Sequence, residues 1–135
     1  MLTTEDTEST EEFENNSLTD AIIGAAIAVH RELGPGLLES VYEKCLGLEL
    51  TKPGFQVCSQ KDIPLTYKGL ALESGFRADL IVENKVLVEL KAVDQLLPVH
   101  TAQVLTYLKL TSLQTALLIN FNVPLLKNGI KRLSI

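Results

Sequence analysis

The stretch Arg77-Ala-Asp-Leu-Ile-Val-Glu-Asn-Lys-Val-Leu-Val-Glu-Leu-Lys91 places three charged residues among aliphatic ones, in a pattern typical of a β-hairpin. Apolar and polar residues alternate along it, as expected for half-buried strands. Opposed residues of an antiparallel pair point to the same side of the sheet. A two-residue turn at Asn84-Lys85 would set Leu80 opposite Glu89 and mix the two faces. We therefore expect a loop of about three residues, from Asn84 to Val86.

This longer loop predicts a polar face on the hairpin. It pairs Leu80 with Leu90, Val82 with Val88, Asp79 with Lys91 and Ile81 with Glu89. A one-residue slip would turn every side chain to the other face, so burial of the aliphatic residues selects this register. Asp79, Glu89 and Lys91 then share one face and form a candidate site.

The charge of the chain is unevenly distributed. A chain of 135 residues suggests one domain with a modest core. Residues 1–17 contain six acids and no Lys or Arg, which leaves 11 acids and 12 bases in the rest. The net charge of −5 thus does not exclude a polyanionic substrate, although the body lacks the basic excess of a strong nonspecific nucleic-acid binder. We expect residues 1–16 to be a disordered acidic tail and residues 17–135 to be the folded domain.

Targeting signals and cysteine spacing favour a cytoplasmic protein. No basic segment precedes an apolar stretch at the N-terminus, and the apolar run over residues 21–29 is too short to span a bilayer. Cys45 and Cys58 lack CxxC spacing, so we expect buried free thiols in a reducing compartment.

The remaining segments predict an α/β fold. Ser17 or Thr19 can cap a helix that ends at Gly34-Pro35-Gly36, and a second helix is expected over residues 37–51. Its expected inward residues are Leu38, Val41, Cys45, Leu46 and Leu50. Strands are expected over residues 55–60, 63–67, 115–121 and 130–135, a loop over 69–75, and a third helix over 98–110. This order predicts a mixed central β-sheet flanked by helices.

The acids of the hairpin suit a divalent cation beside a phosphate. Carboxylate oxygens are the hard ligands that Mg²⁺ and Mn²⁺ prefer. Such a cation polarises a phosphoryl group and lowers the pKa of a bound water. Lys91 could steer that water or stabilise charge on phosphorus. The alternative is a surface cluster of ordinary ion pairs, and spacing alone favours this alternative.

Two helices add polar pairs. Gln103 and Tyr107 lie at i and i+4 on one helix face, and Glu39 and Tyr42 lie at i and i+3 at the start of the second helix. These residues also have structural explanations. Each tyrosine could be a core or rim aromatic with a paired hydroxyl, and Glu39 could be an acid that is favoured in the first turn of a helix.

Together these segments resemble the GxxExxY proteins of the PD-(D/E)xK nuclease superfamily. The matching motifs are Gly36-x-x-Glu39-x-x-Tyr42, Asp79 with Glu89-Leu-Lys91, Gly75-Phe-Arg-Ala-Asp79, and Gln103-x-x-x-Tyr107, which is similar to the QxxxY motif of the RecB-like branch. The resemblance covers residues 18–135 and implies a restriction-endonuclease-like core. A Pro often precedes the first Asp of the family, and Ala78 takes its place here.

The resemblance also implies roles for individual residues. Asp79 and Glu89 would bind Mg²⁺ or Mn²⁺ with Glu39 nearby, and Lys91 would be the catalytic lysine. Gln103 and Tyr107 would orient the water, the lysine or a phosphate. Further candidates for substrate contact are Tyr42, Arg77 and His100. RecB-like enzymes use an upstream histidine ligand, but the sequence does not place His30 at the metal, and the preferred interpretation is a histidine in the last turn of a helix, where it favours the dipole.

Two classes of function remain open. One is a metal-dependent nuclease whose partner is nucleic acid, with DNA favoured over RNA. The other is a non-catalytic or weakly active binding module that acts with a partner protein or as a homodimer, because fold alone does not fix function. A small-molecule enzyme has no supporting motif, since no phosphate-cradling glycine loop precedes a helix.

Overall fold

The computed structural model describes residues 4–135, except for the side chains of residues 4–9, 73 and 74. In chain order the elements are α1 (Thr4–Leu33), α2 (Glu39–Thr51), β1 (Val57–Tyr67), β2 (Leu70–Val82), β3 (Val86–Lys91), α3 (Pro98–Thr111), β4 (Thr115–Asn120), the short 3₁₀ helix η1 (Leu126–Gly129) and β5 (Ile130–Ser134). Over this part of the chain the strands form a five-stranded sheet in the order β1-β2-β3-β4-β5. Strands β3 and β4 are parallel and the other neighbours are antiparallel. The predicted mixed sheet is confirmed.

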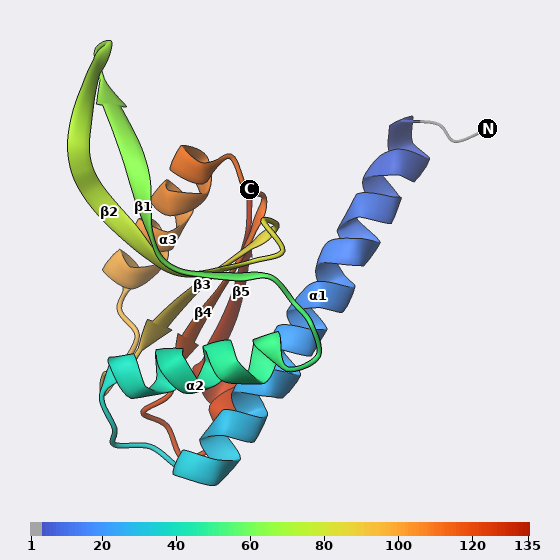
Figure 1. Ribbon diagram of the computed structural model, residues 1–135, viewed down its shortest axis with the longest axis vertical. Helices are drawn as coiled ribbons and strands as arrows, with labels where there is room; N and C mark the ends of the chain where they lie inside the picture. Colours follow the sequence, from blue (N-terminus) through green and yellow to red (C-terminus); the bar gives the residue numbers. More distant parts are fainter. Residues whose placement is uncertain (1–3) are drawn as a thin grey trace.

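Helices cover both faces of this sheet (Figure 1). Helices α1 and α2 pack on one face, against alternate residues of the central strands such as Leu80, Val88 and Leu117. Helix α3 connects the parallel strands β3 and β4 and packs on the opposite face, against Ile81 and Leu87. The alternation predicted from the sequence thus divides the sheet between two apolar clusters. Glu89 and Lys91 have the same parity as Leu87, which assigns them to the α3 side. Asp79 lies between Ala78, which belongs to the α3-side cluster, and Leu80, which belongs to the other cluster, at the point where β2 changes the face that it presents.

The central hairpin has a register different from the predicted one. The observed pairs are Leu80 with Val88, Ile81 with Leu87, and Val82 with Val86. The loop has three residues, as expected, but it begins one residue earlier. Glu83 and Asn84 both adopt positive φ, 53° and 52°, and the Lys85 N–H donates to the Val82 carbonyl at 3.0 Å, which closes the turn directly after the strand. The pairing shifts by two residues, so each side chain keeps its predicted face.

The loop predicted over residues 69–75 is wrong, because β1 and β2 continue through it as a long hairpin. Lys68 and Gly69 turn the chain with φ of 48° and 82°, the positive values that a two-residue hairpin turn requires. The arm extends beyond the rest of the sheet in Figure 1. Pro64 lies on the edge strand β1, as expected, and the β1–β2 register shifts between Ile63 and Leu65 around it.

The N-terminal segment is helical, which corrects the expectation of a disordered tail. Residues 4–16 are the first half of α1, and residues 1–3 lie outside the described part. Acids near a helix N-terminus are favoured by the helix dipole. Two contacts then fix the helix to the sheet: Asn15 is buried and donates to the Thr115 hydroxyl at 3.3 Å, and Glu14 pairs with Lys85 at 3.3 Å. Composition alone cannot indicate such long-range contacts.

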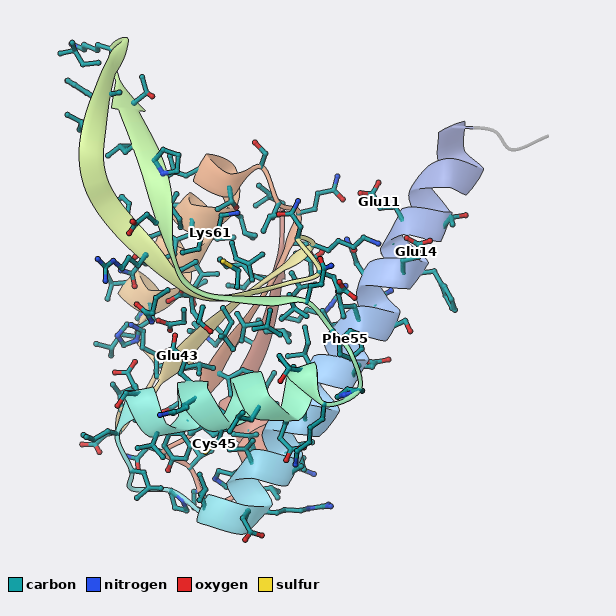
Figure 2. All side chains as sticks on the ribbon, in the orientation of Figure 1. Glu11, Glu14, Glu43, Cys45, Phe55 and Lys61 are labelled. Atoms are coloured by element: carbon teal, nitrogen blue, oxygen red, sulfur yellow. The ribbon has the colours of Figure 1, made fainter. Side chains whose placement is uncertain are left out.

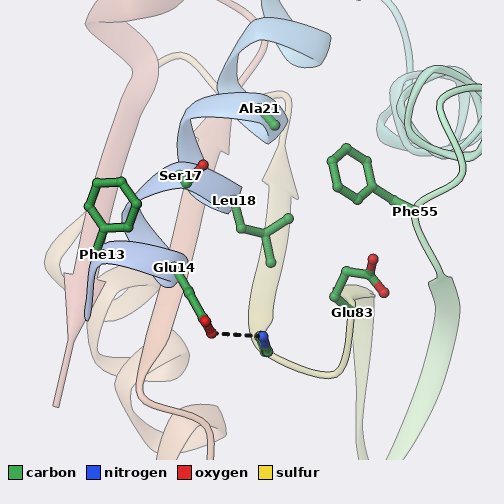
Figure 3. A pocket seen from close by; sticks show the side chains of 8 residues that line it. Phe13, Glu14, Ser17, Leu18, Ala21, Phe55 and Glu83 are labelled. Atoms are coloured by element: carbon green, nitrogen blue, oxygen red, sulfur yellow. Dashed lines mark hydrogen bonds and ion pairs between the residues drawn. The ribbon is translucent and has the colours of Figure 1, made fainter. Parts of the chain in front are cut away.

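A hollow of about 490 Å³ adjoins this part of α1. Figure 3 shows Phe13, Leu18 and Phe55 around it, with the Glu14–Lys85 ion pair beside them. No residue of the predicted site lines this hollow. Between residues 4 and 135, the structure has no helix of the length and apolarity needed to cross a bilayer.

Helix α2 buries a narrower face than predicted. Its buried residues are Tyr42, Leu46 and Leu50, whereas Leu38 and Val41 are 74% and 37% exposed. The reason is Tyr42, whose ring is fully buried and stacks on Phe121 with 4.5 Å between centroids, so the helix turns the preceding aliphatic residues outward. Both cysteines are free, but Cys45 is only half-buried and Cys58 is exposed, which corrects the prediction of two buried thiols.

Candidate active site

Asp79 and Glu89 lie where β2 and β3 diverge. On β2, the residues that pair with β3 run from Leu80 to Val82. Beyond them, the backbone N–H groups of the two strands bond to side-chain carboxylates instead of to each other's carbonyls. The Asp79 backbone N–H donates to Glu89 Oε1 at 3.0 Å, and the Leu90 N–H donates to Asp79 Oδ2 at 2.8 Å. Each carboxylate is therefore held by the backbone of the other strand, and the two acids are neighbours at one fork of the sheet.

Burial makes Glu89 costly to ionise. The Glu89 side chain is 5% exposed. Burial and then the negative charge of Asp79 raise the pKa of Glu89 to about 8, although Lys91 acts in the opposite direction. Without a cation, Glu89 consequently keeps its proton at neutral pH. A divalent cation placed between the carboxylates would remove this penalty.

Helix α3 directs a polar pair at the two acids. Tyr107 is 5% exposed, and its hydroxyl accepts a hydrogen bond from the Gln103 amide at 3.0 Å. Burial raises the pKa of Tyr107, and the charges of Glu89 and Asp79 raise it further. The hydroxyl therefore faces the acid pair, and its own proton remains available for donation. Phe76 packs against the ring with 5.1 Å between centroids and holds it in place.

Lys91 ends β3 on the same strand face as Glu89. It is half-buried and forms no ion pair with any side chain that the structure describes. The buried Asn120, which pairs with Lys91 across β3 and β4, fixes the chain that follows. Its amide accepts from the Val93 N–H at 3.1 Å and donates to the Val93 carbonyl at 2.8 Å. Asn120, which the sequence analysis did not single out, thus anchors the chain that follows β3.

Helix α2 contributes a second acid that the sequence analysis missed. Glu39 is exposed in the first turn, and Glu43 follows one turn later. Burial raises the pKa of Glu43 most, a hydrogen bond from Gln60 lowers it, and Asp79 and then Glu39 raise it again. Glu43 therefore faces Asp79 (its position on α2 is labelled in Figure 2). The i, i+4 spacing from Glu39 was the signal that could have identified it.

Tyr42 lies in the core and not at the acid pair. It has no exposed surface, and its hydroxyl donates to the Gly34 carbonyl at 2.6 Å while accepting from the Leu37 N–H at 3.1 Å. These bonds fix the Gly-Pro-Gly turn between α1 and α2. A substrate contact at Tyr42 disagrees with this burial, and we assign the residue a structural role.

The other basic candidates have separate partners. His30 is 8% exposed and its Nε2 lies 2.8 Å from the Val123 carbonyl, which gives it a structural contact at the end of α1. The His100 ring accepts from the Leu97 N–H at 2.9 Å and so caps α3. Arg77 is exposed and pairs with Asp62 at 3.0 Å, two residues before Asp79 on β2.

The donor set fits an open site for a hard cation. Among residues 4–135, with the side-chain gaps given above, no group of three or more His, Cys, Asp or Glu is arranged to hold a metal ion. Mg²⁺ commonly uses one or two carboxylates and takes its other ligands from water and phosphate. The pair of Asp79 and Glu89, crowded enough to raise the pKa of Glu89, meets this requirement.

A comparison with family models identifies the chain over most of its length. The model of the PD-(D/E)XK nuclease superfamily matches residues 16–133. Searches of curated proteins and of solved structures gave no significant match. Members of this superfamily generally use divalent metal ions and act on nucleic acid. The matched segment contains β1 to β4, all but the last residue of β5, and the acid pair, and its sheet is of the restriction-endonuclease-like type. The protein therefore belongs to the PD-(D/E)XK nuclease superfamily.

Proposed function

We propose that this protein is a metal-dependent nuclease that hydrolyses phosphodiester bonds of DNA, with Mg²⁺ or Mn²⁺ bound by Asp79 and Glu89. The observation that carries the proposal is the fork between β2 and β3, where each carboxylate is held by the backbone of the other strand. Lys91 and the Gln103–Tyr107 pair adjoin this fork. Within the superfamily, the Gly36-x-x-Glu39-x-x-Tyr42 motif supports assignment to the GxxExxY group.

The residues at the fork divide the chemistry between them. A bound divalent cation would polarise the scissile phosphate and lower the pKa of an attacking water. Asp79 and Glu89 would hold the cation, and Glu39 lies near Glu43, which faces Asp79 from α2. The Lys91 ammonium, which forms no ion pair with a described carboxylate, would stabilise negative charge developing on the phosphate. The Tyr107 hydroxyl, held by Gln103, donates to a water or a phosphate oxygen.

The electrostatics of the domain explain why a cation is needed. The acid pair would repel a polyanion, and outside the N-terminal segment the chain is close to neutral, with 11 acids and 12 bases. The cation and Lys91 therefore supply the local positive charge that brings a phosphodiester to the fork. Arg77, exposed on the same strand as Asp79, is placed to contact a neighbouring phosphate.

The test is cleavage of labelled DNA by the purified full chain with Mg²⁺, Mn²⁺ or EDTA. Asp79→Ala, Glu89→Ala and Lys91→Ala should each reduce the rate by about a hundredfold or more, because each removes electrostatic stabilisation of the transition state. Glu83→Ala is the matched control, since it removes an acid from the same hairpin outside the fork. Cleavage that persists in EDTA, or wild-type rates in all three variants, would refute the proposal. A parallel reaction with RNA of the same sequence tests the preference for DNA.

A second candidate function is an assembly module that has the fold without the chemistry. It is favoured by two exposed leucines, Leu38 directly before α2 and Leu48 within it, which are 74% and 58% exposed. Exposed apolar side chains of this size suit a homodimer or a partner protein that covers them. Analytical ultracentrifugation of wild type and Leu38→Lys/Leu48→Lys, run beside the cleavage assay, separates this function from hydrolysis. Self-association lost in the variant, without metal-dependent cleavage in either protein, would favour the module.

A further inference from the structure

Gln60 has an unusual backbone conformation for a strand residue. Its φ is 51°, in the left-handed region, although it lies inside β1. The flanking pairs are Ser59 with Leu80 and Lys61 with Ala78, which places Gln60 opposite Asp79. Residues other than glycine adopt this conformation at an energetic cost, and such positions cluster at functional sites. A glycine would avoid this cost, which indicates that the glutamine side chain makes contacts that glycine could not make.

The Gln60 side chain connects two carboxylates. Its amide nitrogen donates to Glu43 Oε1 at 2.5 Å and to Asp79 Oδ1 at 3.3 Å. A primary amide nitrogen has two hydrogens, one for each of these acceptors. The other oxygen of Asp79 accepts from the Leu90 N–H at 2.8 Å. The Asp79 carboxylate is therefore held from both sides, by the backbone of β3 and by a side chain of β1.

Glu43 serves as the anchor for this contact. It is half-buried on α2 and forms no ion pair with any side chain that the structure describes, so the Gln60 amide is its neutral donor. The arrangement runs from α2 through β1 to the fork between β2 and β3, and it involves three elements that are separate in the sequence. Loss of either member would free the Asp79 carboxylate to rotate about its side chain.

We infer that Gln60, anchored by Glu43, is a positioning residue that fixes the orientation of the Asp79 carboxylate for the cation and the phosphate. The effect on metal and phosphate binding rests on the proposed nuclease function. The contact by which Gln60 orients the Asp79 carboxylate is present without metal. Residues that orient a ligating carboxylate commonly change metal affinity about 10- to 100-fold when removed. This role explains the backbone conformation of Gln60, because in its left-handed conformation the side chain reaches both Glu43 and Asp79.

Two substitutions of Gln60 separate positioning from structural support. Both Gln60→Ala and Gln60→Gly remove the amide, but only glycine adopts a φ of 51° without steric cost. A purely structural role predicts that stability and metal binding fall together in both variants. Positioning predicts that Gln60→Gly melts at or above the temperature of Gln60→Ala while both bind Mn²⁺ about equally weakly. Glu43→Gln retains an acceptor oxygen for the Gln60 amide and should preserve binding, whereas Glu43→Ala should not.

The experiment combines two measurements on the full chain. Amide hydrogen exchange at Leu90, measured by NMR on the metal-free protein, reports whether Asp79 still accepts from that N–H. Calorimetric titration with Mn²⁺ reports affinity. We expect faster exchange at Leu90 and about tenfold weaker Mn²⁺ binding in Gln60→Gly and Glu43→Ala. The control is Glu49→Ala, which removes an acid from α2 that pairs with Lys52.

The outcomes distinguish the two claims. Wild-type exchange at Leu90 in Gln60→Gly would overturn the positioning role, whatever the metal data show. Unchanged Mn²⁺ affinity in Gln60→Gly, beside loss of binding in Asp79→Ala, would also overturn it and leave the proposed nuclease intact. If the wild-type chain binds no Mn²⁺ but Leu90 exchange accelerates in Gln60→Gly, the nuclease proposal fails and the orientation of Asp79 by Gln60 stands.

Discussion

Replacing Glu89 with glutamine should stabilise the metal-free protein at neutral pH while it weakens metal binding. Glutamine has nearly the same shape and keeps an oxygen that can accept from the Asp79 N–H, the bond that Glu89 forms at 3.0 Å. It cannot ionise. The substitution therefore removes the cost of a buried negative charge beside Asp79 without leaving a cavity.

The size of the effect follows from the pKa of Glu89. Burial and the charge of Asp79 raise this pKa from 4.5 to about 8 in the folded protein. Between these values the unfolded chain ionises and the folded chain keeps its proton, so the stability of the wild type falls as the pH rises. At pH 7 the interval above 4.5 is 2.5 pH units, which corresponds to about 3 kcal/mol at 1.36 kcal/mol per unit. Below pH 4.5 both states are protonated and the two proteins should differ little.

The assay is urea unfolding of wild type and Glu89→Gln in EDTA from pH 4.5 to pH 8. The free energy of unfolding of the wild type should decline relative to the variant across this range. Saturating Mn²⁺ should stabilise the wild type more than the variant, because the cation binds the folded state. Equal pH dependence of the two proteins would refute the assigned burial and charge coupling at Glu89.

Three further substitutions test the scaffold. Tyr42→Phe should cost about 1–3 kcal/mol in urea unfolding, since it leaves the partly buried Gly34 carbonyl without its donor. Gly129→Ala should lower the free energy of unfolding by about 1–3 kcal/mol or more, because the added Cβ would overlap the backbone oxygen of Asn120. A melting curve identical to that of the wild type would contradict this. Asn120→Ala should release the chain at Val93, seen as faster exchange of the Val93 amide and a lower cleavage rate; unchanged exchange would argue against the anchor.

Short-range patterns predicted most of the fold. The alternation in the hairpin identified the two faces correctly, because burial on both sides of the sheet enforces a period of two. Helix α3 and strands β4 and β5 also lie close to their predicted positions, at Pro98–Thr111, Thr115–Asn120 and Ile130–Ser134. Proline, glycine and aliphatic runs marked these boundaries, and such signals act within a few residues.

Two of the misses have a long-range origin, and one lies in the hairpin turn itself. The helical state of residues 4–16 is supported by contacts of Asn15 and Glu14 with distant residues, which composition does not reveal. The register of the hairpin depends on positive φ at Glu83 and Asn84. The amino-acid sequence is compatible with both the predicted and the observed register, so it did not indicate this conformation. Glu43 was missed because its neighbours Gln60 and Asp79 reach it only in the folded chain. Local rules cannot supply contacts between α2, β1 and β2.

The most direct test of the account is a calorimetric titration of the wild-type chain with Mn²⁺, with Glu89→Ala and Glu83→Ala titrated under the same conditions. The account predicts saturable binding to the wild type and to Glu83→Ala, and loss of that binding in Glu89→Ala. Equal binding by all three proteins, or binding by none, would contradict the assignment of the fork between β2 and β3 as the metal site.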